Sequence, residues 1–200
     1  MKNEKVLLTL SKLGMLNRRQ IQTLCNTGSI RNTNYIMKKL SPYIDYKDHP
    51  KGRIYKLNQK GIHFIGEGHL LKWGNVEHRL LRNDAYIYFK PIHWQSEIEF
   101  NVMGITIIPD AFFYSGMTYK FLEIDRKQRW YKNVEKIERY AEIKKTKAFQ
   151  KEYKHFPNLI WVVEMESRIK KIKSLCNKNG LHCEVFSVNQ IKNERIGLYA

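Results

Sequence analysis

Residues 109–126 read PDAFFYSGMTYKFLEIDR, and this stretch decides the fold of the second half of the chain. Two runs rich in aromatic and apolar residues flank the turn-forming residues 115–118, a pattern that predicts two antiparallel strands joined by a tight turn. With residues 115–118 as the loop, Tyr114 pairs with Tyr119. This register fixes which side chains of the two strands meet.

The same register brings acidic side chains together. Asp110 lies opposite Glu123, and Asp125 shares the face of Glu123 because side chains alternate along a strand. Leu122 and Ile124 then face the core. Opposed like charges destabilise a strand pair, so a compensating cation is expected, and an all-oxygen ligand set suits Mg²⁺ or Mn²⁺.

The elements around this hairpin predict an α/β sandwich with a mixed sheet. Residues 86–89 either extend the first helix or begin a strand, and Glu97 and Glu99 share one face of the first strand. The expected elements are a helix at 75–83, strands at 94–100, 105–114 and 119–125, a helix at 132–149, a strand at 159–163, a helix at 167–177 and a strand at 183–188.

The carboxylate pattern also resembles a known catalytic core. Pro109-Asp110 followed by Glu123-Ile124-Asp125 looks like the PD-(D/E)xK nuclease motif, a restriction-endonuclease-like fold. The resemblance implies metal-assisted phosphodiester hydrolysis, with Asp110, Glu123 and Asp125 as metal ligands and catalytic residues. Glu77 matches a position where related nucleases sometimes place another ligand.

One position departs from that motif, because Asp125 stands where the nucleases have lysine. Lys127 shares the strand face if the strand extends, so it is the candidate catalytic lysine. Lys132 or Lys136 could instead reach back from the following helix. As an alternative, the carboxylates form a structural charge network with neighbouring bases: Arg126, Lys127 and Arg129.

Residues 1–66 predict a winged helix-turn-helix. Apolar residues at helical spacing indicate three helices, at 4–13, 17–24 and 30–40. Strand, polar turn and strand follow at 43–57, and Asn58 is suited to cap a short helix. Residues 67–74 read as a linker, which leaves 75–200 for the nuclease-like domain.

The third helix has a polar face that suits DNA. We expect base and phosphate contacts from four of its side chains: Arg31, Asn34, Tyr35 and Lys38. Lys51 and Arg53 of the wing would contact the DNA backbone. The alternative is a small protein-interaction domain, but residues 1–70 hold 13 basic and only 4 acidic side chains, which favours DNA.

Composition points to the same class of partner. The 200 residues carry 36 Lys and Arg against 19 Asp and Glu, a formal net charge of +17. A polyanion, above all nucleic acid, is the expected partner. No apolar run approaches the roughly 20 residues of a membrane span. The three cysteines form no CxxC pair and cannot all be in bridges, which indicates a reducing, cytoplasmic location.

The order of these parts resembles the replication-relaxation family. The resemblance rests on a winged helix-turn-helix followed by Pro109-Asp110-Ala111 and by residues 121–126. It implies a DNA-binding protein of a plasmid or other mobile element that acts in replication, DNA relaxation or its regulation. The alternative is an active Mg²⁺- or Mn²⁺-dependent DNA endonuclease or nickase. A homodimer and replication or transfer proteins are the further partners considered.

Overall fold

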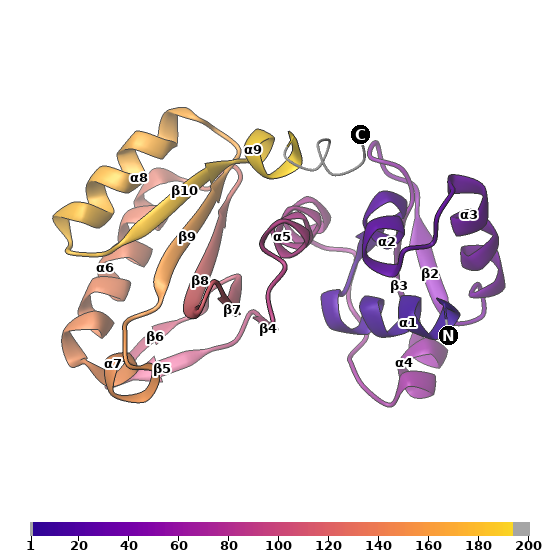
Figure 1. Ribbon diagram of the computed structural model, residues 1–200, viewed down its shortest axis with the longest axis horizontal. Helices are drawn as coiled ribbons and strands as arrows, with labels where there is room; N and C mark the ends of the chain where they lie inside the picture. The colour runs from indigo at the N-terminus through magenta and orange to yellow at the C-terminus, as the bar shows by residue number, and fades with distance from the viewer. Residues whose placement is uncertain (1, 194–200) are drawn as a thin grey trace. The chain divides into compact units, whose positions relative to one another are not determined.

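The computed structural model describes residues 2–193 and divides the chain into two units, Met1–Ile87 and Tyr88–Ala200 (Figure 1). The first unit opens with three helices. Its elements are α1 (Lys2–Leu13), β1 (Leu16–Asn17), α2 (Arg18–Cys25), α3 (Ile30–Lys39), β2 (Ile44–Lys47), β3 (Ile54–Leu57), α4 (Gln59–Ile65) and most of α5 (Val76–Phe89).

The expected three helices and hairpin are all present in this unit. Side-chain caps set the helix starts: Asn17 and Gln20 form a capping box at α2, and Asn58 accepts a 2.9 Å hydrogen bond from the amide of Gly61 at α4. The two-residue strand β1, which the sequence did not predict, pairs with β3 in a sheet of order β1-β3-β2. The order of three helices, a hairpin and a closing helix is the order expected of a winged helix, and the hairpin of β2 and β3 is called the wing below.

Helix α5 places the boundary between the units later than the predicted linker at 67–74. The amide of Gln20 donates to the carboxylate of Asp84 at 2.8 Å, and Asn83 donates to the carbonyl of Met15 at 2.7 Å. These buried hydrogen bonds tie α5 to the first unit, which extends to residue 87. Residues 86–89 extend this helix rather than beginning a strand.

The second unit is built on a mixed five-stranded sheet of order β10-β9-β8-β7-β4. Strands β8, β9 and β10 are parallel, whereas β8, β7 and β4 are antiparallel. The α/β class with a mixed sheet is therefore confirmed. The strands are β4 (His93–Ser96), β5 (Phe100–Val102), β6 (Ile105–Ile107), β7 (Ala111–Ser115), β8 (Thr118–Asp125), β9 (Asn158–Val163) and β10 (Cys183–Ser187).

The register predicted for the hairpin of β7 and β8 is confirmed. Tyr114 pairs with Tyr119, and Ala111 pairs with Leu122. Gly116 and Met117 both have positive φ, at 58° and 63°, as a two-residue hairpin turn requires. The strand pairing begins at Ala111, so Asp110 stands just before β7.

Two of the predicted strands are wrong because each is broken. The span 94–100 contains β4 and β5, separated at Glu97, whose φ of 54° is incompatible with a strand. Glu97 and Glu99 therefore share no strand face. The span 105–114 contains β6 and β7, separated at Pro109, which has no N–H to donate to a sheet. Strands β5 and β6 form their own two-stranded sheet.

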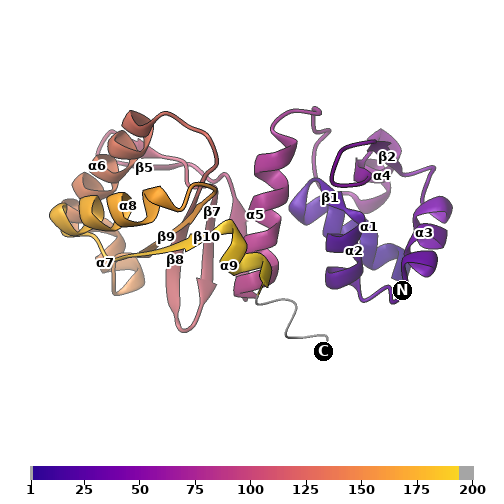
Figure 2. The same ribbon diagram turned by 90° about the horizontal axis from the view of Figure 1, so that it is seen from above.

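Helices cover one face of the five-stranded sheet (Figures 1 and 2). They are α6 (Trp130–Thr146), α7 (Ala148–Tyr153) and α8 (Ser167–Lys178), and a short α9 (Val188–Asn193) follows β10. Phe121, Ile137 and Ile172 lie in the core between this face and its helices. On the opposite face, Phe89 at the end of α5 contacts the rings of Phe113 and Phe186.

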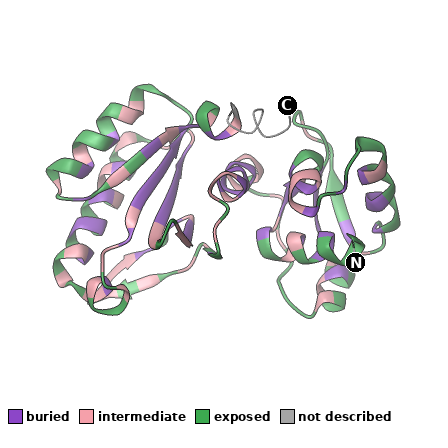
Figure 3. Cartoon of the chain, viewed as in Figure 1, coloured by how far each residue is buried: buried purple, intermediate pink, exposed green. Residues whose placement is uncertain are grey.

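Both faces of β8 are consequently buried (Figure 3). The sequence predicted that Leu122 and Ile124 face the core, and they are buried. Glu123 and Asp125 on the other face are equally buried, beneath α6, at 1% and 0% exposure. The carboxylates of β8 therefore lie inside the unit rather than on an open patch, and they need partners within it.

Candidate functional site

Helix α3 presents the polar face that the sequence predicted. Its buried side chains are Thr33, Ile36 and Met37, which fall at helical spacing toward the core. The four expected DNA-contacting side chains all lie exposed on the other side: Arg31, Asn34, Tyr35 and Lys38. Ser29 caps the helix by accepting a 3.2 Å hydrogen bond from the amide of Asn32.

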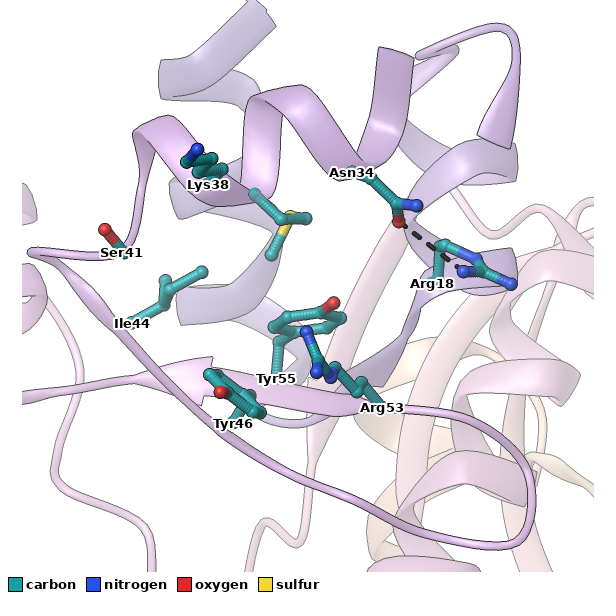
Figure 4. A pocket seen from close by; sticks show the side chains of 9 residues that line it. Arg18, Asn34, Lys38, Ser41, Ile44, Tyr46, Arg53 and Tyr55 are labelled. Carbon is teal, nitrogen blue, oxygen red and sulfur yellow. Dashed lines mark hydrogen bonds between the residues drawn. The ribbon is translucent and has the colours of Figure 1, made fainter. Parts of the chain in front are cut away.

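A groove of about 580 Å³ lies between α3 and the wing (Figure 4). Asn34 and Lys38 of α3 line one side, and Tyr46 and Arg53 of the hairpin line the other. Arg18 of α2 closes one end, where its guanidinium donates to the Asn34 side-chain oxygen at 3.5 Å. Of the predicted helix and wing residues, Asn34, Lys38 and Arg53 thus share one basic, aromatic-lined groove, whereas Arg31, Tyr35 and Lys51 lie outside its lining.

Arg53 is held in position although it is exposed. Its Nε lies 3.1 Å from Oδ1 of Asp48, and its guanidinium sits 4.6 Å from the centre of the Tyr46 ring. The hydrogen bond that Arg53 donates to Asp48 raises the pKa of Arg53 further above its already high value. A cation that is oriented before a ligand arrives loses less side-chain entropy on binding.

Lys51, the other predicted wing contact, is paired with an acid of α5. Its ammonium bonds to the carboxylate of Glu77, and His49 Nε2 lies 3.1 Å from the other oxygen of that carboxylate. Glu77 lies in the first unit and binds the wing. The carboxylate expected as a further ligand of the nuclease-like site thus has two basic partners in the wing.

The hairpin does bring Asp110 and Glu123 together. The amide of Asp110 donates to the carbonyl of Leu122 at 2.9 Å, and Oδ2 of Asp110 accepts a 2.6 Å hydrogen bond from the amide of Ile124. Burial raises the pKa of Glu123, and the nearby charge of Asp110 adds to that rise. Asp110 remains partly exposed, whereas Glu123 does not.

Helix α6 supplies two partners for Glu123. The Tyr140 hydroxyl donates to Oε1 at 2.7 Å, and the Lys136 ammonium bonds to Oε2. Burial alone would lower the pKa of Lys136, but the charges of Glu123, Asp110 and Asp125 raise it above its ordinary value. Burial beside Glu123 raises the pKa of Tyr140 as well. Lys136 therefore remains a charged ammonium at the carboxylates.

Lys136 takes the place that the sequence analysis gave first to Lys127. Strand β8 ends at Asp125, so Lys127 is not on its face and is exposed. Lys132 pairs with Glu135 on its own helix, at 3.4 Å. Of these three lysines, only Lys136 reaches back from the following helix to the carboxylates.

Asp125 has a separate set of partners. Arg168 of α8 donates from Nη1 to both carboxylate oxygens, at 2.6 and 2.5 Å, and Asn133 donates to Oδ2 at 2.7 Å. The neutralising cation is thus Arg168 rather than the neighbours proposed for a charge network. One of those neighbours, Arg126, instead pairs with Glu164 at 3.7 Å.

This arrangement bears on the predicted metal ligands. Within residues 2–193, no group of three or more His, Cys, Asp or Glu side chains is arranged to hold a metal ion. Asp125 is enclosed by Arg168 and Asn133, and both carboxylate oxygens of Glu123 are bonded to Lys136 and Tyr140. Cys176, buried, and Cys183, half-buried, are both free thiols.

Three side chains that bond to the carboxylates were not predicted from the sequence. Asn133 and Tyr140 flank Lys136 at helical spacing, three residues before and four after it. Both are buried, and polar residues on an apolar helix face are the signal that could have identified them. Arg168 gave no comparable signal, because its pairing depends on how β9 and α8 cross over.

Comparison with known proteins identifies the family. A model of the replication-relaxation family matches residues 7–159. The chain belongs to the replication-relaxation family. The match spans the winged helix, the hairpin of β7 and β8, and α6, so it contains both candidate sites.

One solved structure resembles this replication-relaxation protein over 98% of the chain: the crystal structure of protein VC1899 from Vibrio cholerae, at 12% sequence identity and a TM-score of 0.39. The chain spans 52% of that protein's length. A search of curated proteins gave no match. Among the described residues of this replication-relaxation protein, no helix is both long and apolar enough to cross a membrane.

Proposed function

We propose that this replication-relaxation protein binds duplex DNA through α3 and the wing, and that it serves replication or relaxation of a plasmid or other mobile element. The observation that carries the proposal is the shared groove, in which Asn34 and Lys38 of α3 face Tyr46 and Arg53 of the wing. A helix fits the major groove, and an adjacent wing reaches the phosphates.

The side chains of α3 and the wing suit different parts of DNA. Asn34 can bond a base edge through its amide, although Arg18 competes for its oxygen at 3.5 Å. Arg31 and Lys38 can neutralise phosphates or bond guanine, and Arg53 is oriented toward the same ligand. Phosphate contacts set affinity and base contacts set sequence preference.

A salt titration with matched variants tests this proposal. We expect the affinity of the full chain for duplex DNA to fall by about a thousandfold from 50 to 200 mM salt if roughly six phosphates are contacted. Arg31→Gln with Lys38→Gln should reduce the steepness of that fall by about two contacts. Lys145→Gln with Lys147→Gln removes the same charge from exposed positions elsewhere and is the control. Equal effects of the two double variants would refute the assignment.

The second candidate function is metal-dependent DNA nicking at the carboxylates. The observation that favours it is the ammonium of Lys136 at Glu123, since the nuclease motif requires a lysine there and its usual position holds Asp125. Asp110 and Glu123 would hold Mg²⁺ or Mn²⁺, which would polarise the phosphodiester. Lys136 would orient the attacking water, in the role first considered for Lys127.

Supercoiled plasmid with Mg²⁺ or Mn²⁺ separates the two functions. If the protein is an enzyme, the wild type should nick the plasmid, and Asp110→Asn and Lys136→Met should not. Lys132 is an exposed lysine one turn earlier, so the Lys132→Gln control should still nick. Intact plasmid together with salt-dependent binding would identify a non-cleaving DNA-binding protein.

A further inference from the structure

Helix α8 carries an unbalanced positive charge. Its twelve residues include five bases and no acid: Arg168, Lys170, Lys171, Lys173 and Lys178. The neighbouring helix α6 differs, because its bases alternate with Glu135, Glu138 and Glu142. The charge of α6 is thus partly balanced along its own surface, whereas that of α8 is not.

Three of these lysines surround a hollow of about 480 Å³. Lys171 and Lys178 lie seven residues apart with Leu175 between them, which places all three on one side of the helix. Lys170 and Ser174 extend this lining along α8. Trp130, the first residue of α6, also lines the hollow, and Figure 2 shows the two helices side by side.

The lysines of the hollow have no acid partners within the part of the chain that the structure describes. Among residues 2–193, no ion pair involves Lys170, Lys171 or Lys178, and all three are exposed. The nearest acid along the sequence is Glu166, one turn before Lys170. Neighbouring ammonium groups repel one another, and a bound polyanion relieves this repulsion while releasing its own counterions.

We propose that the hollow between α8 and Trp130 binds a single strand of DNA. The lysines contact successive phosphates, and an unpaired base rests against the indole. Sites for single strands combine a basic groove with an aromatic ring in this way, whereas the bases of a duplex are stacked inside it and cannot enter a hollow. This site rests on the proposed DNA-binding function and adds the binding of a single strand to it. It uses residues outside α3 and the wing.

Binding of two probes by the full chain tests the proposal. The probes are a fluorescent oligothymidine of about 20 nucleotides and a mixed-sequence duplex of the same length. Lys170→Gln, Lys171→Gln and Lys178→Gln together should weaken binding of the single strand about tenfold and reduce its salt slope by about 2. Lys145→Gln, Lys147→Gln and Lys151→Gln remove equal charge from exposed positions of the same unit.

A Trp130→Leu variant tests the stacking. It should weaken oligothymidine binding about tenfold and leave duplex binding unchanged, in protein whose melting temperature matches that of the wild type. Because Trp130 packs partly on the core, the lysine variants provide an independent readout if this variant is unstable.

Two results would overturn the proposal. The first is equal loss of oligothymidine binding in the α8 and control triple variants. The second is an α8 triple variant that binds the duplex more weakly but binds oligothymidine as tightly as the wild type does. Failure of the proposed function gives a different pattern. In that case Arg31→Gln with Lys38→Gln would leave duplex binding unchanged. Oligothymidine binding by the α8 and control triple variants could still be compared.

Discussion

The ammonium of Lys136 on α6 pairs with the carboxylate of Glu123 on β8, thirteen residues earlier in the chain. Two residues after Glu123, where the nuclease motif has lysine, Asp125 is neutralised by Arg168 from α8. Helices therefore supply both cations that the strand itself lacks. The site keeps a carboxylate and a lysine together although the linear motif is broken.

The first prediction concerns the pH dependence of stability. Burial raises the pKa of Glu123 above its ordinary value of 4.5, so the folded chain keeps this proton to higher pH than the unfolded chain does. The associated stability is complete below the ordinary value and is lost as the pH rises from there to the raised pKa. The melting temperature of Glu123→Gln should therefore rise relative to that of the wild type as the pH increases above this ordinary value.

Differential scanning fluorimetry across this pH range measures the gain. Glu142→Gln, an exposed change on the same helix that carries Lys136, serves as the control and should track the wild type. A constant difference between Glu123→Gln and the wild type at every pH would contradict the raised pKa.

The second prediction concerns the buried pair of Asp125 and Arg168. Arg168→Met leaves the carboxylate of Asp125 buried without its cation, which should cost about 3–5 kcal/mol of unfolding free energy. Asp125→Lys should be at least as harmful, because it places an ammonium beside the guanidinium. Restoring the motif lysine at that position is thus expected to unfold the site rather than to create activity.

Urea unfolding followed by circular dichroism measures both variants. Arg126→Met, which removes the surface pair with Glu164, is the matched control and should cost no more than about 1 kcal/mol. A loss below 1 kcal/mol for Arg168→Met would show that the pair is not enclosed.

The third prediction concerns the wing. Glu77→Gln removes the charge that pairs with Lys51 and His49, so Lys51 becomes available to a phosphate. Because a partly exposed pair contributes about 1 kcal/mol or less, affinity for duplex DNA should rise by about fivefold or less. Fluorescence anisotropy at fixed salt measures the change. Glu67 is an exposed acid of the same unit, so Glu67→Gln should raise the affinity for duplex DNA less. Equal rises in affinity for the two variants would show that the pairing of Glu77 has no effect on DNA binding.

The fourth prediction concerns divalent ions. If Asp110 and Glu123 hold Mg²⁺ or Mn²⁺, the melting temperature should rise progressively with millimolar metal. Asp110→Asn should abolish most of that rise, since it removes one ligand charge and little volume. Asp48→Asn, an exposed aspartate of the wing, should not. Melting curves that coincide in EDTA and in metal would assign Asp110 and Glu123 to structure alone.

The sequence predicted elements whose signals are local. Strand alternation and the turn at 115–118 were enough to fix the register of Tyr114 with Tyr119, and the cap at Asn58 was read correctly. The broken strands were missed because the left-handed conformation of Glu97 is imposed by its surroundings, and non-glycine residues rarely adopt it.

The candidate site was predicted less completely for a similar reason. Asp110 and Glu123 come from adjacent strands of one hairpin, so the register alone brings them together. Arg168 reaches Asp125 from 43 residues away, through a parallel crossover that no short pattern encodes. The exposed face of α3 was predictable because helical periodicity separates it from Ile36 and Met37.

The single helix α5 contributes to two hydrophobic interiors, since its polar residues bond to the first unit and Phe89 contacts Phe113 in the second. A fragment that ends at residue 66 would lose this helix and leave Gln20 without its partners. A fragment designed to fold as the first unit must therefore extend through α5 at least as far as residue 87, and a cut at the loop of residues 66–74 would divide one buried polar network.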